Sequence, residues 1–380
     1  MNQSSTAPRR STRRIAGLVP VRYTPMCSAQ DRLGLADRGF QYVNIDDGWQ
    51  GTRGSDGRIR PNERFADMQA LADSIHGLGL KFGMYTSPGP LTCGEYEGSY
   101  GHEAQDVATY CTWGVDLLKY DYCSYRQIAP EGTREQIQAA YRLMGELLRN
   151  AERDILFSLC EYGMQRVWEW GREAGGHLWR TTSDIVPIWR SVRTIGFGQH
   201  ALTSYSGPGG WNDPDMLEVG HVGGWGPPPH PTALTPDEQL THVGLWCLLG
   251  APLLLGCDLR QMDDWTLALL SNEEVLAVDQ DPLGARCRRV RKDSDTQVWA
   301  RELHDRSVAV GLFNLGPDSA TVRVSWEELG LRGPCLARDL WHRSDCGVFD
   351  KEYSSSVPSH GMAMLRVRGP DNAPGEGANC

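Results

Sequence analysis

The sequence predicts a (β/α)8 barrel followed by a smaller antiparallel β domain. Apolar runs that fit buried strands alternate with amphipathic helices at intervals of roughly 30 to 40 residues, which is the pattern of βα units with a parallel sheet. Seven strand candidates fall between residues 41 and 258, and each ends in a polar residue. A doubly wound open sheet usually offers one or two such strand ends at a switch point, so the repetition favours the barrel.

The barrel is expected over residues 29–285, with each strand read from an apolar run that stops at a polar side chain. The strand candidates are 41–47, 80–86, 115–121, 155–161, 177–184, a short one ending within 211–218, and 251–258. Helices are expected at 29–39, 65–78, 103–113, 133–148, 164–174, 188–197, from 235 onward, and across 263–279. Two of these begin with a capping box, Thr133 with Gln136 and Thr235 with Glu238.

After about residue 285 the alternation of predicted strands and helices ends. Short strand-like runs separated by turns occur at 297–301, 308–314, 320–325, 337–339 and 362–367. They are typical of an antiparallel β domain, which we expect over 286–368. Residues 1–28 and the Gly-, Pro- and Asn-rich stretch 369–380 are expected to be atypical or disordered.

Composition and charge argue against several functions. The formal net charge of −10 disfavours nucleic-acid binding, because phosphates require a basic surface. No apolar run is long enough to span a membrane, and the basic N-terminus lacks the apolar core of a signal peptide. Neither a Walker-type loop nor a GxGxxG turn follows a predicted strand, so no nucleotide cofactor is expected.

Other residue types leave alternatives open. The 13 Trp residues suit clefts for flat, hydroxyl-bearing ligands such as sugars, although core positions would explain most of them equally well. A metal site of Asp46 or Asp47 with Asp213 or Asp215 is disfavoured, since no His or Cys lies beside them at ligand spacing. The 11 Cys form no zinc-type CxxC pairs. Two of them, at positions 93 and 123, follow predicted strands and are compatible with a disulfide and an oxidising compartment, with buried free thiols as the alternative.

The strand ends carry the groups that glycoside hydrolysis requires. This reaction uses two carboxyl groups, one kept anionic and one able to deliver a proton. Asp121 follows Lys119 on the same face of its strand, and a nearby ammonium favours the ionised carboxylate of a nucleophile. Asp184, which follows Arg180 and a Thr-Thr-Ser run, is the candidate acid/base. Either aspartate could instead cap the helix that follows its strand.

Six ordered motifs make the chain similar to glycoside hydrolase family 27, the α-galactosidase and α-N-acetylgalactosaminidase family. They are YVNIDDGW (42–49), GLKFGMYTSPGPLTCGEYEGSYGHEAQD (79–106), WGVDLLKYDYC (113–123), LWRTTSDI (178–185), GGWNDPDMLEVG (209–220) and LLGAPLLLGCDL (248–259). The similarity covers about residues 36–285 closely and extends to the family's C-terminal β domain. It implies a retaining exo-glycosidase that removes terminal α-D-galactosyl residues by double displacement, without a cofactor or metal. The expected partner is an α-galactoside oligosaccharide or glycoconjugate, and the expected state is a monomer or homodimer.

The resemblance also implies a role for each site residue. Asp121 matches the family's nucleophile and Asp184 its acid/base. Asp46 and Asp47 match the pair that binds the 4- and 6-hydroxyls of the sugar, which distinguishes an axial from an equatorial O4. The other matches are Lys119 as a ligand of sugar hydroxyls, Arg180 and Asp215 near O2, Tyr85, Cys93 and Trp211 in the pocket wall, and a Cys93–Cys123 disulfide.

Glu161 falls on the loop that reads the substituent at C2 in this family. A Glu there leaves less room for an N-acetyl group than a Ser with a nearby Ala, and it can accept a hydrogen bond from a 2-hydroxyl, so galactose is favoured. The Tyr162-Gly163-Met164 that follows departs from the Trp-containing variants of characterised members. The alternatives are an α-N-acetylgalactosaminidase and a catalytically impaired sugar-binding relative. Retention of both Asp46 and Asp47 disfavours the β-L-arabinopyranosidase branch.

The chain departs from the family most at its start. Family members open with a PMGWNSW-like first strand, whose Trp lines the sugar site, followed by a full first helix. Here residues 26–30 run straight into the end of that helix. The first barrel strand is therefore missing or divergent, or residues 15–24 take its place. The resemblance suggests a periplasmic or extracellular location, which the N-terminal sequence itself does not specify.

Overall fold

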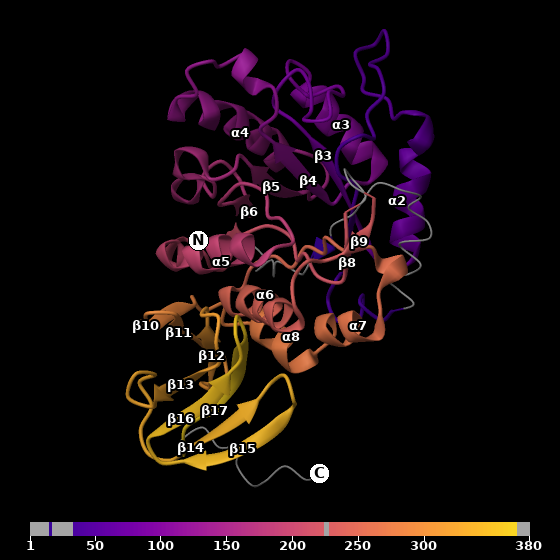
Figure 1. Ribbon diagram of the computed structural model, residues 1–380. Coiled ribbons are helices and arrows are strands. Elements are labelled where there is room, and N and C mark those ends of the chain that lie inside the picture. Colours follow the sequence, from indigo (N-terminus) through magenta and orange to yellow (C-terminus); the bar gives the residue numbers. More distant parts are fainter. Residues whose placement is uncertain (1–14, 17–32, 224–227, 371–380) are drawn as a thin grey trace, which may run out of the picture.

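The computed structural model describes residues 15–16, 33–223 and 228–370, which form a barrel and a C-terminal β domain (Figure 1). Our expectations for the remainder of residues 1–28 and for 371–380 lie outside the described residues. Within the described part, no helix combines the length and the apolar character needed to cross a membrane.

Seven parallel strands form the barrel sheet in chain order. They are β1 (Ile15–Ala16), β2 (Tyr42–Asn44), β3 (Lys81–Thr86), β4 (Leu117–Asp121), β5 (Leu156–Cys160), β6 (Leu178–Arg180) and β7 (Trp211–Asp213). The first position is occupied by β1, where Ile15 pairs with Tyr42 of β2. A divergent two-residue strand within 15–24 therefore takes the place of the family's first strand.

The eighth position holds an extended segment, not the regular strand predicted at 251–258. Leu255 makes a parallel bridge to Leu217, and Cys257 makes an antiparallel bridge to Val222. Val222 belongs to β8 (His221–Val222), which pairs with β9 (His230–Pro231). Pro252 lacks the N–H that a continuous ladder would need, so isolated bridges replace the ladder here.

Helices cover the outside of this sheet. They are α2 (Met68–Gly77), α3 (Glu103–Trp113), α4 (Arg134–Arg149), α5 (Trp189–Gly198), α6 (Pro236–Leu249), α7 (Asp264–Leu270) and α8 (Glu273–Asp279). Both predicted capping boxes are confirmed, at the starts of α4 and α6. The helices predicted across 263–279 are confirmed as α7 and α8, and Asn272 caps the second of them.

Two other predicted helices are wrong. Residues 33–39 form turns instead of the end of a helix. The stretch 164–174 contains a 3-10 helix, Met164–Glu169, that is broken by positive φ angles of 52° at Gln165 and 57° at Arg166. A left-handed residue cannot continue a right-handed helix, so the apolar spacing of this stretch is misleading.

The C-terminal domain is a β-sandwich, as predicted. Its six-stranded sheet has the order β10 (Arg288–Asp293), β11 (Thr296–Glu302), β12 (Val308–Asn314), β17 (Met362–Arg368), β14 (Cys335–Asp339) and β15 (Ser344–Phe349), and its two-stranded sheet pairs β13 (Ala320–Ser325) with β16 (Glu352–Val357). The five predicted strands are present. The sequences of β10, β15 and β16 contain few apolar residues, and our sequence analysis missed them.

The centre of the six-stranded sheet is buried on both faces, and every residue of β12 is buried. Along β12, Val310 and Leu312 pack into the sandwich core, whereas Ala309 and Phe313 pack toward the barrel helices. Phe313 makes an edge contact with Phe197 of α5, with ring centres 5.1 Å apart. Helix α6 lies between the barrel and this sheet (Figure 1), so one continuous core joins the two domains.

His360 links the sandwich to the segment that follows Asp184. It lies in the turn before β17 and stacks on Trp189, the first residue of α5, with ring centres 4.5 Å apart and an interplanar angle of 18°. Its Nδ1 lies 2.6 Å from Oε1 of Glu238 in the capping box of α6. His360 thus contacts two barrel helices at once.

We predict that His360→Ala lowers the free energy of unfolding by about 1–2 kcal/mol, because it removes both the stacking contact and the contact with Glu238. Urea or thermal unfolding measures this change. The matched control is His342→Ala, since His342 is exposed and contacts Asp339 three residues away. Equal effects of the two substitutions would contradict the proposed link between the domains.

Candidate active site

Strand β4 carries the first two candidate site residues, Lys119 and Asp121. Its side chains alternate, so Tyr120 and Leu118 pack outward against the helices, whereas Leu117 and Lys119 line a cavity inside the barrel. Asp121 ends the strand on the same inner face as Lys119. The sequence prediction that these two side chains share a face is therefore confirmed.

Lys119 pairs with Asp46 at the end of β2. The Nζ atom is 2.8 Å from Oδ2 of Asp46 and lies 5.1 Å from the ring centre of Tyr85. Desolvation opposes the charge of Lys119, but the neighbouring charges of Asp46 and Asp121 raise its pKa well above the usual value. Lys119 therefore remains a cation that can bind hydroxyl oxygens between two carboxylates.

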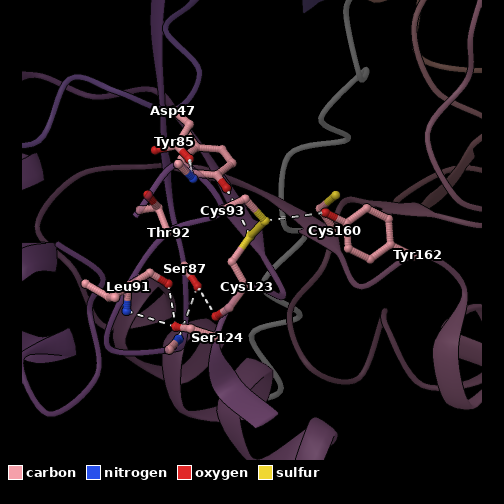
Figure 2. The surroundings of a disulfide bond; sticks show 12 residues. Asp47, Tyr85, Ser87, Leu91, Thr92, Cys93, Cys123, Ser124, Cys160 and Tyr162 are labelled. Carbon is pink, nitrogen blue, oxygen red and sulfur yellow. Dashed lines mark hydrogen bonds between the residues drawn. A yellow bond between two sulfur atoms is a disulfide. The ribbon is translucent and has the colours of Figure 1, made fainter. Parts of the chain in front are cut away.

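Asp47 is held by the loop that follows β3. Its Oδ2 accepts a hydrogen bond from the Gly94 N–H at 2.6 Å, and its Oδ1 accepts one from the Gly48 N–H at 2.8 Å. Next to Gly94, Cys93 is joined to Cys123 by the expected disulfide, which is thereby confirmed (Figure 2). The disulfide ties the loop that holds Asp47 to the residues immediately after β4.

The Asp121 carboxyl group is buried, with 5% of the residue exposed. Burial raises its pKa above the usual value, whereas the charge of Lys119 and hydrogen bonds from the Tyr162 hydroxyl and the Cys160 thiol act to lower it. Within the described structure, Oδ1 of Asp121 has no hydrogen-bond partner. A buried oxygen without a partner is unusual, and this one is available to a group of a bound ligand.

Arg180, the last residue of β6, holds the second group of carboxylates. One guanidinium nitrogen lies 2.8 Å from Oδ1 of Asp184 and 2.9 Å from Oδ2 of Asp215. The side chains of Arg180 and Asp215 are each 4% exposed, but that of Asp184 is 61% exposed. Asp184 can therefore exchange a proton with water at the rim, which the buried Asp121 cannot do as readily.

Two residues that our sequence analysis missed lie between these groups. Cys160 pairs with Asp121 in the sheet register, and its Sγ accepts a contact of 3.7 Å from Arg180. The ring of Tyr162 lies 5.7 Å from the guanidinium carbon of Arg180. Strand alternation from Ser158 could have identified Cys160, because every second residue of β5 faces inward. No strand pattern extends to Tyr162.

Asp213 is a third missed residue. It ends β7 almost fully buried, and one of its carboxylate oxygens accepts a hydrogen bond from the Asp215 N–H at 2.8 Å. Burial raises its pKa to about 6, although the charge of Arg180 opposes this rise. The sequence analysis considered Asp213 only as a metal ligand, whereas the structure places it beside Arg180.

Glu161 directly follows β5, and its role toward C2 of a sugar stays a prediction. Glu161 is fully buried, and its Oε1 accepts a 3.4 Å hydrogen bond from the Gly163 N–H. Burial raises the pKa of Glu161 well above its usual value, whereas backbone hydrogen bonds and the charge of Arg180 act to lower it. Glu161 therefore lies within electrostatic reach of the Arg180 cluster.

Trp211 lies at the opposite end of β7 from Asp213. It begins β7 and pairs with Leu178, whereas Asp213 at the other end of the strand pairs with Arg180. At a rise of about 3.3 Å per residue, Trp211 starts roughly 7 Å below the edge that carries the carboxylates. Its ring borders Gly284, after α8. Trp211 therefore begins two residues before the strand end that carries Asp213, and its expected place in the pocket wall stays a prediction.

One group of potential metal ligands occurs in the described part of the chain: Cys93, Asp121 and Cys123. Both cysteines are joined in the disulfide, so the group offers no thiolate to an ion.

Comparisons with known proteins agree with this geometry. Residues 22–281 match the family model described as alpha galactosidase A, and residues 293–367 match the alpha galactosidase C-terminal beta sandwich domain. An α-galactosidase from Cyamopsis tetragonoloba is 43% identical over 337 residues, which cover 87% of this chain and 78% of the relative. The crystal structure of α-galactosidase I from Mortierella vinacea has a TM-score of 0.84 at 30% identity, covering 90% of this chain and 91% of that one. An α-galactosidase from Saccharomyces cerevisiae, solved with raffinose, has a TM-score of 0.80 at 26% identity and covers 90% and 92% of the two chains.

Glu218 is a buried acid behind Asp215. It is 4% exposed, and its backbone N–H donates a hydrogen bond to Nε2 of His242 at 3.1 Å. Burial and the charge of Asp215 raise the pKa of Glu218 to about 8, from an ordinary value of 4.5. The unfolded chain therefore loses this proton at a lower pH than the folded chain, and stability falls as pH rises from 4.5 to about 8.

We predict that Glu218→Gln removes this dependence. The carboxamide keeps the shape of a neutral carboxyl, so the variant should gain on the order of 3 kcal/mol over the wild type at pH 8 and little at pH 4.5. Urea unfolding at both pH values measures the difference. A constant difference across this range would show that Glu218 titrates normally in the folded protein.

Proposed function

The chain belongs to the α-galactosidase family, and from this membership we propose that it is a retaining α-galactosidase that removes terminal α-D-galactosyl residues from oligosaccharides or glycoconjugates. The observation that carries this proposal is the pairing of two carboxyl groups in opposite surroundings. Asp121 is buried beside a cation, and Asp184 is exposed on the rim. This division suits one nucleophile and one proton donor.

In the first step, the Asp121 carboxylate attacks the anomeric carbon as the glycosidic bond breaks. Asp184 gives its proton to the departing oxygen, and the galactosyl group becomes an ester of Asp121. In the second step, water attacks the same carbon, Asp184 accepts a proton from that water, and Asp121 leaves as a carboxylate. Two inversions at one carbon retain its configuration.

The surrounding groups suit the recognition of galactose. Asp46 and Asp47 offer carboxylate oxygens to the 4- and 6-hydroxyls, and Lys119 offers a donor to a neighbouring oxygen. Arg180 and Asp215, which form a buried ion pair, are proposed to bind the ring near O2. Tyr85 and the Cys93–Cys123 disulfide border the same cluster, because the Tyr85 hydroxyl lies 3.3 Å from Sγ of Cys123.

The direct test is release of p-nitrophenol from p-nitrophenyl α-D-galactoside by the full chain, with the α-N-acetylgalactosaminide assayed in parallel. NMR of the first product should show α-galactose, as retention requires. Turnover of the N-acetyl substrate alone would keep the mechanism and reverse the sugar preference. Sugar binding without turnover of either substrate would make the protein a binding relative.

We predict that Asp121→Asn lowers kcat by at least about 10³-fold while galactose binding remains measurable, because an amide cannot form the ester intermediate. Calorimetry with galactose provides the second measurement. The matched control is Asp350→Asn, an exposed aspartate in the C-terminal domain. Retained turnover in Asp121→Asn would mean that the nucleophile is another residue.

Asp184→Ala should affect substrates according to their leaving groups. Alkyl or sugar leaving groups need protonation, so we predict a loss of about 10²–10⁴-fold in kcat/KM for these substrates. Dinitrophenyl α-galactoside needs little protonation and should lose far less. A series of aryl and sugar galactosides measures this difference, and equal losses across the series would exclude Asp184 as the acid.

A further inference from the structure

The residue after Glu161 adopts an unusual backbone conformation. Tyr162 has a φ of 62°, in the left-handed region that non-glycine residues rarely occupy. Gly163 is also left-handed, and a Cβ there would lie 2.2 Å from the carbonyl oxygen of Thr181, so only glycine fits. Strained residues of this kind persist where the surrounding structure fixes them, and they concentrate at functional sites.

This turn directs the Tyr162 side chain toward the disulfide (Figure 2). The hydroxyl oxygen lies 3.9 Å from Sγ of Cys93. That sulfur, Sγ of Cys123 and a carboxylate oxygen of Asp121 all lie within 4.8 Å of one another. The Tyr162 hydroxyl and the Asp121 carboxylate thus border the same sulfur atom, and a side-chain hydrogen bond between the two residues acts on the pKa of each.

The Tyr162 hydroxyl can act toward Asp121 only as a hydrogen-bond donor. Burial and the charges of Cys160 and Asp121 raise the pKa of Tyr162 above its ordinary value, so it keeps its proton at every working pH. An ionised carboxylate has no hydrogen to give. The proton of this contact therefore belongs to the tyrosine.

We propose that the Tyr162 hydroxyl is a further catalytic group, which donates a hydrogen bond to the Asp121 carboxylate and makes it a better leaving group in the second step. This inference rests on the proposed function. When the bond between C1 and Asp121 breaks, its electron pair goes to the carboxylate, and a donor already in place stabilises that charge. In the first step the same donor weakens the nucleophile, so the hydroxyl favours deglycosylation at the expense of glycosylation.

Four other titratable groups also lie around Asp121. Lys119 on β4 favours the ionised form, whereas Asp46 on β2 disfavours it. Cys160 on β5 is a weak donor to the same carboxylate. Tyr85 on β3 is held by contact with Cys123. Removing one hydroxyl leaves all four of these groups in place.

The test is Tyr162→Phe in the full chain, assayed with p-nitrophenyl α-D-galactoside across pH. Loss of the donor should move the acidic limb of kcat/KM to higher pH by about 0.5 to 1 unit, because Asp121 becomes harder to ionise. Deglycosylation should slow by about tenfold relative to glycosylation, which produces or enlarges a burst of p-nitrophenol. Azide, an added nucleophile, should attack C1 of the galactosyl ester and release the Asp121 carboxylate, which raises the steady-state rate that follows the burst.

The matched control is Tyr125→Phe, a tyrosine four residues beyond Asp121 that packs against Tyr122. It should leave both the acidic limb and the burst unchanged. Tyr162→Trp, which also lacks the hydroxyl, should shift the limb upward even if the Phe variant folds poorly.

An unchanged acidic limb in a folded Tyr162 variant would overturn the inference, because a purely structural role would lower activity equally at every pH. The wild-type assay keeps the two proposals distinguishable. Absence of wild-type turnover would contradict the proposed function, whereas wild-type turnover with identical pH profiles in all variants would contradict the role of Tyr162 alone.

Discussion

The buried guanidinium of Arg180 is the interaction on which the site depends. It bridges Asp184 on the exposed rim and Asp215 in the interior. A buried cation is tolerated only when its partners are fixed, and Asp215 is fixed in a strained conformation, with a φ of 81°. The Ile185 N–H donates to its carboxylate, and the Trp246 indole donates to its carbonyl. Removing Arg180 would leave Asp215 buried without its counter-charge and Asp184 without an anchor.

The site has more acids than cations, and this imbalance governs its chemistry. Asp46, Asp47, Asp121, Asp184, Asp213 and Asp215 gather around Lys119 and Arg180. Like charges and burial both raise carboxyl pKa values, and Asp213 rises to about 6. Each cation lies beside one or two of these carboxylates, Lys119 at 2.8 Å from Asp46 and Arg180 at 2.8 Å from Asp184 and 2.9 Å from Asp215. A sugar that brings donor hydroxyls relieves the surplus of acceptors, so the arrangement prepares the site for a neutral, hydroxyl-rich ligand.

Much of this site could be predicted from strand patterns. A period of two placed Lys119 and Asp121 on one face, and the recurrence of acids at strand ends indicated a barrel. The predictions failed where the backbone leaves regular geometry. Glu161 follows β5 and is fully buried, so a strand pattern alone does not define its role. Tyr162 reaches the site through a left-handed turn, which no periodicity encodes.

Similar reasons explain the missed elements outside the site. A 3-10 helix replaced the predicted helix at 164–174 because two left-handed residues interrupt it. The polar strands β10, β15 and β16 are paired through backbone hydrogen bonds, so their side chains give little hydrophobic signal. Contacts with the rest of the fold determine the conformation of these segments, which their local sequence does not predict.

The C-terminal sandwich supports the half of the barrel whose sheet is weakest. Beyond β7, isolated bridges at Leu255 and Cys257 replace a continuous ladder in the described segment. Helix α6 covers this region and is buried over most of its length, so it needs an apolar layer on its outer side as well. The six-stranded sheet provides that layer. Since His360 also stacks on Trp189, five residues after Asp184, the sandwich supports the chain segment that carries Asp184. Loss of the domain would expose α6 and loosen that segment together, so folding of the sandwich and positioning of Asp184 are physically linked.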